Sequence, residues 1–111
     1  MEECIFCKIK LNELPSTKVY EDEDFFIIKD INPMAKIHFI AIPKEHYGSL
    51  DMQTKKGEEV FGYIIHKIST MQEELGLTNG YRLVINQGED AGQTVHHLHI
   101  HILGGEKLKG L

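Results

Sequence analysis

The segment His96-His97-Leu98-His99-Ile100-His101-Ile102-Leu103 decides how this 111-residue chain is interpreted. From its second residue onward, imidazole side chains alternate with aliphatic ones. Residues two apart lie on the same face of a β-strand. The segment therefore predicts a strand with three imidazoles on one face and three aliphatic side chains in a core on the other. The imidazoles belong to His97, His99 and His101, and the aliphatic side chains to Leu98, Ile100 and Ile102.

Four further strands are predicted by runs of aromatic and β-branched residues. An acidic tetrapeptide at residues 21–24 predicts a hairpin turn between the first two of them. A proline ends the third run, because proline cannot continue a central strand. The four runs are Val19–Tyr20, Phe25–Ile28, His38–Pro43 and Tyr81–Asn86.

Apolar residues spaced three and four apart predict a long helix from Glu58 to Leu75, which Gly76 ends. A short amphipathic helix is predicted near residues 5–14. The order is then helix, three strands, helix, two strands. Tight turns between most strands favour an α+β fold with a five-stranded antiparallel sheet. The length predicts one domain over residues 1–111.

The composition, with 41% hydrophobic and 26% charged residues, is typical of a soluble globular protein. A net charge of -5 argues against a surface that binds nucleic acid, which needs clustered Lys and Arg. The first residues show no basic, apolar leader, and no apolar run approaches the length of a membrane span. We expect a cytoplasmic protein without a nucleic-acid or membrane partner.

The three alternating histidines favour either phosphoryl transfer or a metal centre. A neutral imidazole is a competent nucleophile near pH 7 and forms a phosphohistidine that water later cleaves. A second, protonated imidazole would stabilise the charge on the phosphoryl oxygens. Three imidazoles with a water also form a catalytic zinc site. The pattern alone leaves both interpretations open.

A polar loop over residues 86–94 directly precedes the histidines. Gly88 and Gly92 permit backbone conformations in which successive N–H groups face an anion. Thr94 adds a hydroxyl beside them. A glycine-containing loop is weak support by itself, but its position upstream of three co-facial histidines indicates a phosphate site.

The stretch His97–Leu103 resembles the His-φ-His-φ-His-φ-φ signature, with φ apolar, of the histidine triad family of nucleotide hydrolases and transferases. The resemblance extends to the opening Cys-Ile-Phe-Cys, to His38–Lys44 and to the loop sequence Ala-Gly-Gln-Thr-Val. Gly104-Gly105 resembles the Hint-type branch, which hydrolyses purine nucleoside phosphoramidates. Members of that branch often carry a Trp-containing tail, and this chain contains no Trp.

The resemblance implies a role for each matching residue at the reacting atoms. His99 would be the nucleophile that takes the nucleotidyl group, and His101 would contact the α-phosphate. His38 would orient or protonate these rings, and Thr94 would hydrogen-bond the leaving atom. No catalytic metal is implied.

The same resemblance implies a set of nucleotide-binding residues. Asp30 would accept hydrogen bonds from both ribose hydroxyls. The base would contact apolar walls, for which Ile31, Phe6 and Phe26 are candidates. The phosphate would be held by Asn86 and by the backbone around Gly92 and Gln93.

Cys4-Ile5-Phe6-Cys7 is compatible with a redox pair, with two inert residues or with half of a zinc site. A redox pair would need a thioredoxin-like context, which the sequence does not show. The resemblance implies a structural zinc, as in many microbial triad proteins. A site closed by four protein ligands would stabilise the fold rather than catalyse. The implied ligands are Cys4, Cys7, His46 and His97.

The expected protein is therefore a homodimeric hydrolase whose two sheets join. It would bind an AMP-like purine nucleotide and cleave the phosphorus–nitrogen bond of a nucleoside 5′-phosphoramidate. Two alternatives stay open at this point, a dinucleoside polyphosphate hydrolase and a nucleotide-binding interaction module with little turnover.

Overall fold

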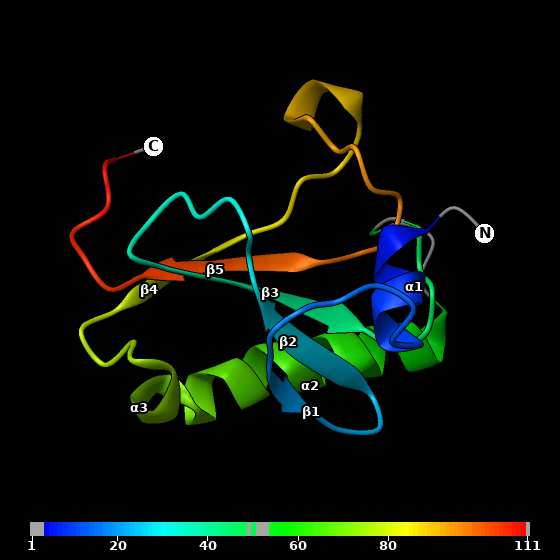
Figure 1. Ribbon diagram of the computed structural model, residues 1–111, viewed down its shortest axis with the longest axis horizontal. Coiled ribbons are helices and arrows are strands. Elements are labelled where there is room, and N and C mark those ends of the chain that lie inside the picture. Colours follow the sequence, from blue (N-terminus) through cyan, green and yellow to red (C-terminus); the bar gives the residue numbers. More distant parts are fainter. Residues whose placement is uncertain (1–3, 49, 51–53, 111) are drawn as a thin grey trace.

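The computed structural model describes residues 4–48, 50 and 54–110. Residues 1–3, over which the sequence shows no basic, apolar leader, lie outside the described residues. The chain forms a five-stranded sheet in the order β1-β2-β3-β5-β4, and every neighbouring pair is antiparallel (Figure 1). This confirms the predicted α+β class. The strands are β1 Lys18–Glu21, β2 Phe25–Lys29, β3 Ile37–Pro43, β4 Tyr81–Val84 and β5 Ile100–Gly104.

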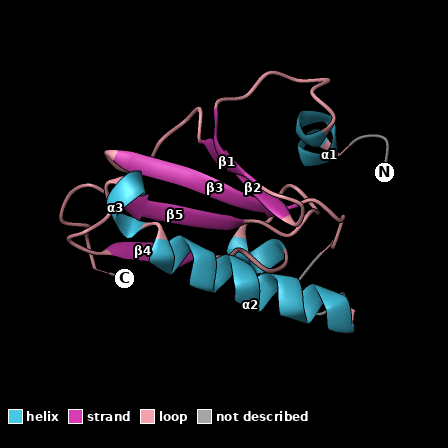
Figure 2. Cartoon of the chain, turned by 90° about the horizontal axis from the view of Figure 1, so that it is seen from below, coloured by secondary structure: helices cyan, strands magenta, loops and turns pink. Residues whose placement is uncertain are grey.

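Helices cover the two faces of the sheet unequally. The long helix α2, Lys55–Thr70, packs along one face, and the short helix α1, Ile5–Lys10, lies against the other (Figure 2). Phe25 and Ile27 therefore belong to the core under α2, whereas Phe26 and Ile28 belong to the core under α1. Cover on both faces explains why the Phe25–Ile28 run is apolar throughout instead of alternating.

The long helix differs from its prediction at both ends. It begins at Lys55 because the Thr54 hydroxyl caps it, accepting a hydrogen bond from the Gly57 N–H at 3.0 Å. Met71 interrupts it, and a separate turn, α3 Gln72–Leu75, follows. Gly76 ends this turn with φ 77°, as predicted. No helix among the described residues is long and apolar enough to cross a membrane.

Three other predicted elements are shorter in the structure, and one of them is the strand predicted over Tyr81–Asn86, which ends at Val84. Helix α1 ends at Lys10 rather than near residue 14. Strand β5 begins only at Ile100, so His97 and His99 precede it. The reason is that the Leu98 N–H donates to the Tyr47 carbonyl, outside the sheet. The predicted alternation still holds, because Ile100 and Ile102 pack into the core under α2.

A long connection, residues 85–99, joins β4 to β5 and rises from the sheet near its middle (Figure 1). It contains a short turn of 3-10 helix, η2 Glu89–Ala91. The Gln93 side chain closes this loop, accepting from the Gly88 N–H at 2.9 Å and donating to the Gly48 carbonyl at 3.1 Å. The loop is thereby anchored to the chain that follows β3.

Candidate functional site

Three histidines and one aspartate meet on the face of the sheet that α2 leaves uncovered. Ile40 of β3 lies directly opposite His101 of β5, so both side chains lie on this face, and His38 shares it two residues earlier. His38 and His99 are buried, with 7% and 9% of their surface exposed, and His101 is half-buried. Asp30 follows the end of β2 and completes the group.

A chain of hydrogen bonds determines which nitrogen carries the hydrogen in two of these rings. The Met34 N–H donates to His38 Nδ1 at 3.0 Å, so neutral His38 carries its hydrogen on Nε2. That Nε2 lies 2.9 Å from His101 Nδ1, which must then accept. His101 therefore carries its hydrogen on Nε2 and can donate it to a bound phosphate.

His99 has the opposite arrangement. Its Nδ1 lies 2.7 Å from the His97 carbonyl, and a carbonyl can only accept, so the ring hydrogen is on Nδ1. The lone pair is then on Nε2. Burial lowers the pKa of His99, which keeps the ring unprotonated at neutral pH. The ring thus offers the neutral nitrogen that a nucleophile requires.

Asp30 is held close to the histidine pair. One carboxylate oxygen accepts from the Asn32 N–H at 2.8 Å, and the other lies 3.3 Å from His38 Nε2 and 4.0 Å from His101 Nδ1. Burial lowers the pKa of both His38 and His101, and the carboxylate only partly offsets this effect. Both rings are therefore expected to be neutral at pH 7.

The donor atoms of Asp30, His38 and His101 are close enough to surround a metal ion. The hydrogen bond from Met34 argues against that use. It places the lone pair of neutral His38 on Nδ1, so the Nε2 that faces the other two residues carries a hydrogen. We interpret the trio as a hydrogen-bonded chain that orients His101.

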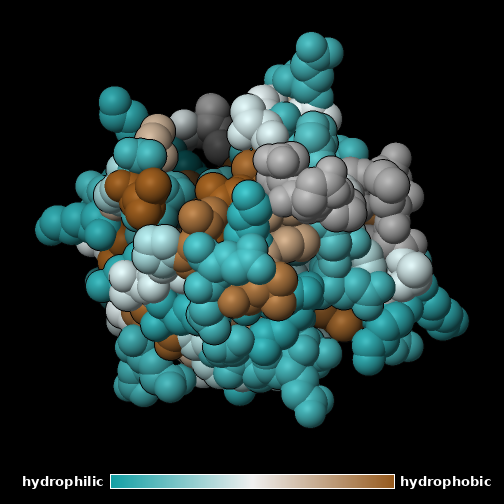
Figure 3. Space-filling view, turned by 45° about the vertical axis from the view of Figure 1, so that its right-hand side comes forward, coloured by the Kyte–Doolittle hydropathy of each residue, from teal (hydrophilic) through white to brown (hydrophobic). Residues whose placement is uncertain are grey.

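An apolar cavity of about 230 Å³ opens beside Asp30. Helix α1 forms one wall with Ile5, Phe6 and Ile9, and Ile31 from the connection after β2 also lines the cavity. The prediction that Phe26 lines a base site is wrong, because its side chain is fully buried in the core between α1 and the sheet. Figure 3 shows apolar atoms exposed on the side of the molecule where α1 lies.

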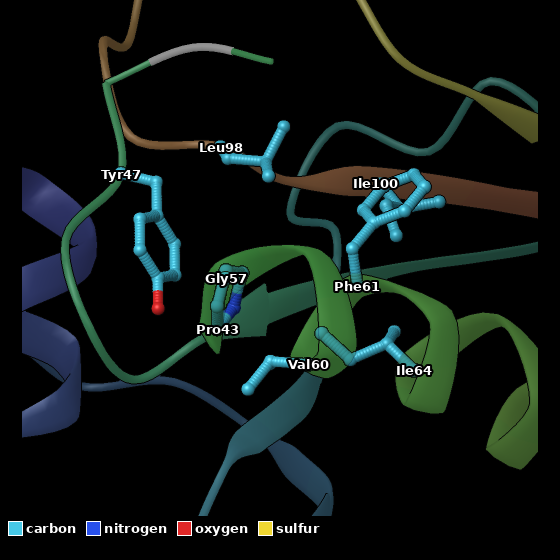
Figure 4. Close-up of a pocket in the computed structure, with 8 residues that line it drawn as sticks. All are labelled: Pro43, Tyr47, Gly57, Val60, Phe61, Ile64, Leu98 and Ile100. Carbon is cyan, nitrogen blue, oxygen red and sulfur yellow. The ribbon is translucent and has the colours of Figure 1, made fainter. Parts of the chain in front are cut away.

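The aliphatic residues of the histidine segment pack on the other face of the sheet, the one that α2 covers. Leu98 and Ile100 line an apolar pocket together with Tyr47 and side chains of α2 (Figure 4). His66 and His96, which have no assigned role, are exposed. The alternation therefore divides this segment between a packed core and a histidine site.

The loop predicted to hold phosphate is tightly turned. Gly88 and Gly92 have φ values of 86° and 79°, a region that favours glycine. The N–H groups of Gly92 and Gln93 already donate to the carbonyls of Glu89 and Gly88. Thr94 is exposed next to them, and Asn86 is half-buried two residues after β4. Phosphate contacts by Asn86, Gly92 and Gln93 stay a prediction.

The second predicted cluster also forms. Cys4 and Cys7 at the start of α1 meet His46, which follows β3, and His97. The Cys4 sulfur lies 3.2 Å from His97 Nδ1, and the Cys7 sulfur lies 3.3 Å from His46 Nδ1 and 3.6 Å from His97 Nδ1. Tetrahedral zinc, with bonds of about 2.0–2.3 Å, would place its ligands roughly 3.3–3.8 Å apart. The four residues therefore fit a zinc ion.

The environment of this cluster suits a cation. His97 Nε2 donates to the Pro43 carbonyl at 2.9 Å, which directs the Nδ1 lone pair toward the two sulfurs. Burial lowers the pKa of His97 to about 4, so the ring stays neutral. The Cys4 sulfur accepts from the Cys7 N–H at 3.3 Å, which fixes its position at the start of α1.

An antiparallel sheet that carries buried histidines with fixed tautomers on one face defines a small α+β protein with a candidate histidine site. The chain belongs to the HIT domain family, whose domain model matches residues 12–108.

Curated and solved relatives support the same family. The chain is 43% identical over 104 residues to Protein HitA of Neisseria gonorrhoeae, covering 94% of this chain and 97% of that protein. It is 45% identical to a HIT family hydrolase from Clostridium thermocellum, with a TM-score of 0.92 over 100% of this chain and 97% of that one. The chain is therefore similar over its whole length to HIT family proteins, one of which is named a hydrolase.

Two further solved structures carry more specific names. One is a zinc-bound histidine triad family protein from Mycobacterium smegmatis, at 34% identity and TM-score 0.82, covering 97% of this chain and 81% of that one. The other is a histidine triad nucleotide-binding protein from Candida albicans, at 32% identity and TM-score 0.81, covering 90% of this chain and 73% of that one.

Proposed function

We propose that this protein hydrolyses the phosphorus–nitrogen bond of purine nucleoside 5′-phosphoramidates through a nucleotidyl intermediate on His99. The observation that carries the proposal is the hydrogen bond from His99 Nδ1 to the His97 carbonyl, which leaves Nε2 with a free lone pair. A buried neutral imidazole with this orientation is suited to attack phosphorus. The nucleotide-binding relative from Candida albicans is consistent with such a substrate.

The cavity beside Asp30 would bind the nucleoside. Its apolar walls suit a purine ring, and Asp30, which also lines it, would accept hydrogen bonds from the ribose hydroxyls. A 5′-phosphate attached to that ribose would then extend toward His99 and His101, because Asp30 lies within 4.0 Å of His101. Thr94, which is exposed two residues after Gly92, would hydrogen-bond the leaving group at this phosphate position.

The first chemical step would transfer the nucleotidyl group. His99 Nε2 attacks the α-phosphorus, and the bond from phosphorus to the amine nitrogen breaks. The amine leaves with a proton that water supplies through the Thr94 hydroxyl. The Nε2–H of His101 donates to a non-bridging oxygen, where negative charge grows in the transition state.

The second step would restore the enzyme. Water attacks the same phosphorus, the bond between phosphorus and His99 Nε2 breaks, and the proton of the water passes to solvent. The products are a nucleoside monophosphate and a free amine. His38 does not touch the reacting atoms in this scheme but positions His101 through the 2.9 Å hydrogen bond.

Cys4, Cys7, His46 and His97 would hold a structural zinc. Such an ion supplies no chemistry here, because four protein ligands leave no position for water or substrate. The zinc-bound relative from Mycobacterium smegmatis supports this part of the proposal.

A comparison of substrates tests the proposed activity. We expect the kcat/KM for adenosine 5′-phosphoramidate to exceed that for diadenosine tetraphosphate by about tenfold or more. Such a ratio would mean that the enzyme stabilises the transition state of the phosphoramidate more strongly. The reverse order would favour the dinucleoside polyphosphate hydrolase. Tight AMP binding without turnover of either substrate would favour the interaction module.

A further inference from the structure

One wall of the apolar cavity is formed by a helix that is too short to be stable without its attachment to the sheet. Helix α1 has six residues, and isolated helices shorter than about 12–15 residues are marginal in water. Yet Ile5, Phe6 and Ile9 of this helix form one wall of the cavity. The position of that wall therefore depends on whatever attaches α1 to the sheet.

The cysteine–histidine cluster provides much of that attachment. Cys4 is the N-cap of α1, and Cys7 lies in its first turn. Their sulfurs lie 3.2–3.6 Å from ring nitrogens of His46 and His97, both of which belong to the chain around the sheet. Between the two cysteines, Ile5 and Phe6 face the cavity, and the Phe6 ring contacts the His99 ring at 4.9 Å between centroids.

We propose that the Cys4–Cys7–His46–His97 cluster sets the nucleotide affinity of the cavity, with Cys4 and Cys7 acting as positioning residues for its α1 wall. This inference rests on the proposed function, because it assumes that the cavity binds the nucleoside. A bound zinc ion would hold the first turn of α1 against the sheet, so the wall is in place before the nucleotide arrives. Pre-organisation of this kind raises affinity without adding a contact.

Two isoleucines that line the same cavity from different elements make a matched test. Ile5 belongs to α1 and is 43% exposed, whereas Ile31 belongs to the β2–β3 connection and is 89% exposed. Because both are largely exposed, replacement by alanine should leave the core intact. AMP affinity is measured by calorimetry for wild type, Ile5→Ala and Ile31→Ala, each loaded with zinc and each stripped by a chelator.

We expect removal of zinc to weaken AMP binding by wild type about tenfold. Ile5→Ala should weaken binding several-fold with zinc and less than about twofold without it, since the wall is then already displaced. Ile31→Ala should have the same effect in both states. Equal AMP affinity with and without zinc would overturn the proposal, and so would a zinc effect that Ile5→Ala leaves unchanged.

Hydrogen exchange supplies a readout independent of nucleotide binding. Zinc removal should increase exchange at the amides of residues 6–10 while those of residues 40–42 in β3 stay protected. Loss of protection in both would overturn the local mechanism in favour of general unfolding. If the zinc-loaded protein fails to bind AMP at all, the proposed function fails, whereas zinc-independent AMP binding refutes only the present inference.

Discussion

At the scale of single residues, the chemistry depends on which ring nitrogen of each histidine carries the hydrogen. The sequence predicts that His97, His99 and His101 lie near one another. The structure brings His99 and His101 together with His38, whereas His97 lies with the cysteines. The sequence does not predict the tautomers. Those follow from backbone groups at His97, Met34 and Pro43, and any residue could supply such groups, so no sequence signal marks them.

His38 can be separated from the rings that touch substrate. His38→Ala removes the donor to His101 Nδ1 and frees that ring to adopt the other tautomer. We expect kcat to fall by about 10–100-fold, with little change in KM. This is less than most general acid–base groups contribute, which is roughly 10²–10⁴-fold, because His38 acts only through His101. Steady-state kinetics measure the effect, and His66→Ala, an exposed histidine on α2, serves as the control. Equal loss in both variants would refute the positioning role.

The pH profile follows from the same pair. Burial lowers the pKa of His38 and of His101, so the neutral forms persist below the usual histidine value of about 6.5. Protonation of His38 Nδ1 would break its bond from the Met34 N–H. We expect kcat/KM to stay level from pH 8 down to about 6.5 and to decline only below it. A decline that is already half complete at pH 7 would contradict these shifts.

At the scale of elements, glycines explain part of the resemblance to the Hint-type branch. Gly105 has φ 81°, and an added Cβ would lie 2.8 Å from a side-chain carbon of Ile37. The fold itself therefore requires glycine at this position. For that reason, the pair Gly104-Gly105 says little about which substrate the protein acts on. The branch assignment stays part of the proposal.

Glycine substitutions test this explanation directly. Gly105→Ala should lower the free energy of unfolding by about 1–3 kcal/mol, from backbone strain and crowding together. Gly62→Ala is the matched control, because this helical position is exposed with no atom near the added carbon. That substitution should raise stability by about 0.5–1 kcal/mol. Denaturant titration measures both, and a neutral Gly105→Ala would refute the structural requirement.

Element boundaries were harder to predict than element types. All five strands and both principal helices were expected, but β5 starts three residues late and α2 three residues early. Each difference has a local cause that periodicity does not register. Leu98 bonds outside the sheet to Tyr47, and the Thr54 hydroxyl caps α2 before its apolar stripe begins.

At the scale of the whole molecule, one histidine-rich segment serves two sites. His97 faces the cysteines, and His99 and His101 face the proposed phosphate position. Spacing alone could not divide the three rings in this way, because the division depends on α1 lying against the end of the sheet. The single-domain organisation, the cytoplasmic location and the homodimer stay predictions. Strands β1 and β4 form the two edges of the described sheet, and either edge could pair with the sheet of a second copy.

Metal removal has a consequence for the stability of the whole protein. A ligand that binds only the folded state raises its stability, so stripping zinc should lower the melting temperature of the wild type by several degrees. The double variant Cys4→Ser/Cys7→Ser should melt at a lower temperature and respond little to a chelator. Differential scanning calorimetry checks both. A chelator-insensitive wild type that contains no zinc by elemental analysis would contradict the structural zinc.

The central claim is that His99 carries the nucleotidyl group during turnover. Rapid acid-free quenching of the protein with an adenosine 5′-phosphoramidate, followed by peptide mass spectrometry, tests it most directly. We expect the added mass of an adenylyl group on the peptide that contains His99, with fragment ions assigning it to that ring, and no such adduct in His99→Ala. An adduct on His97 or His101, or turnover that persists in His99→Ala, would contradict the account.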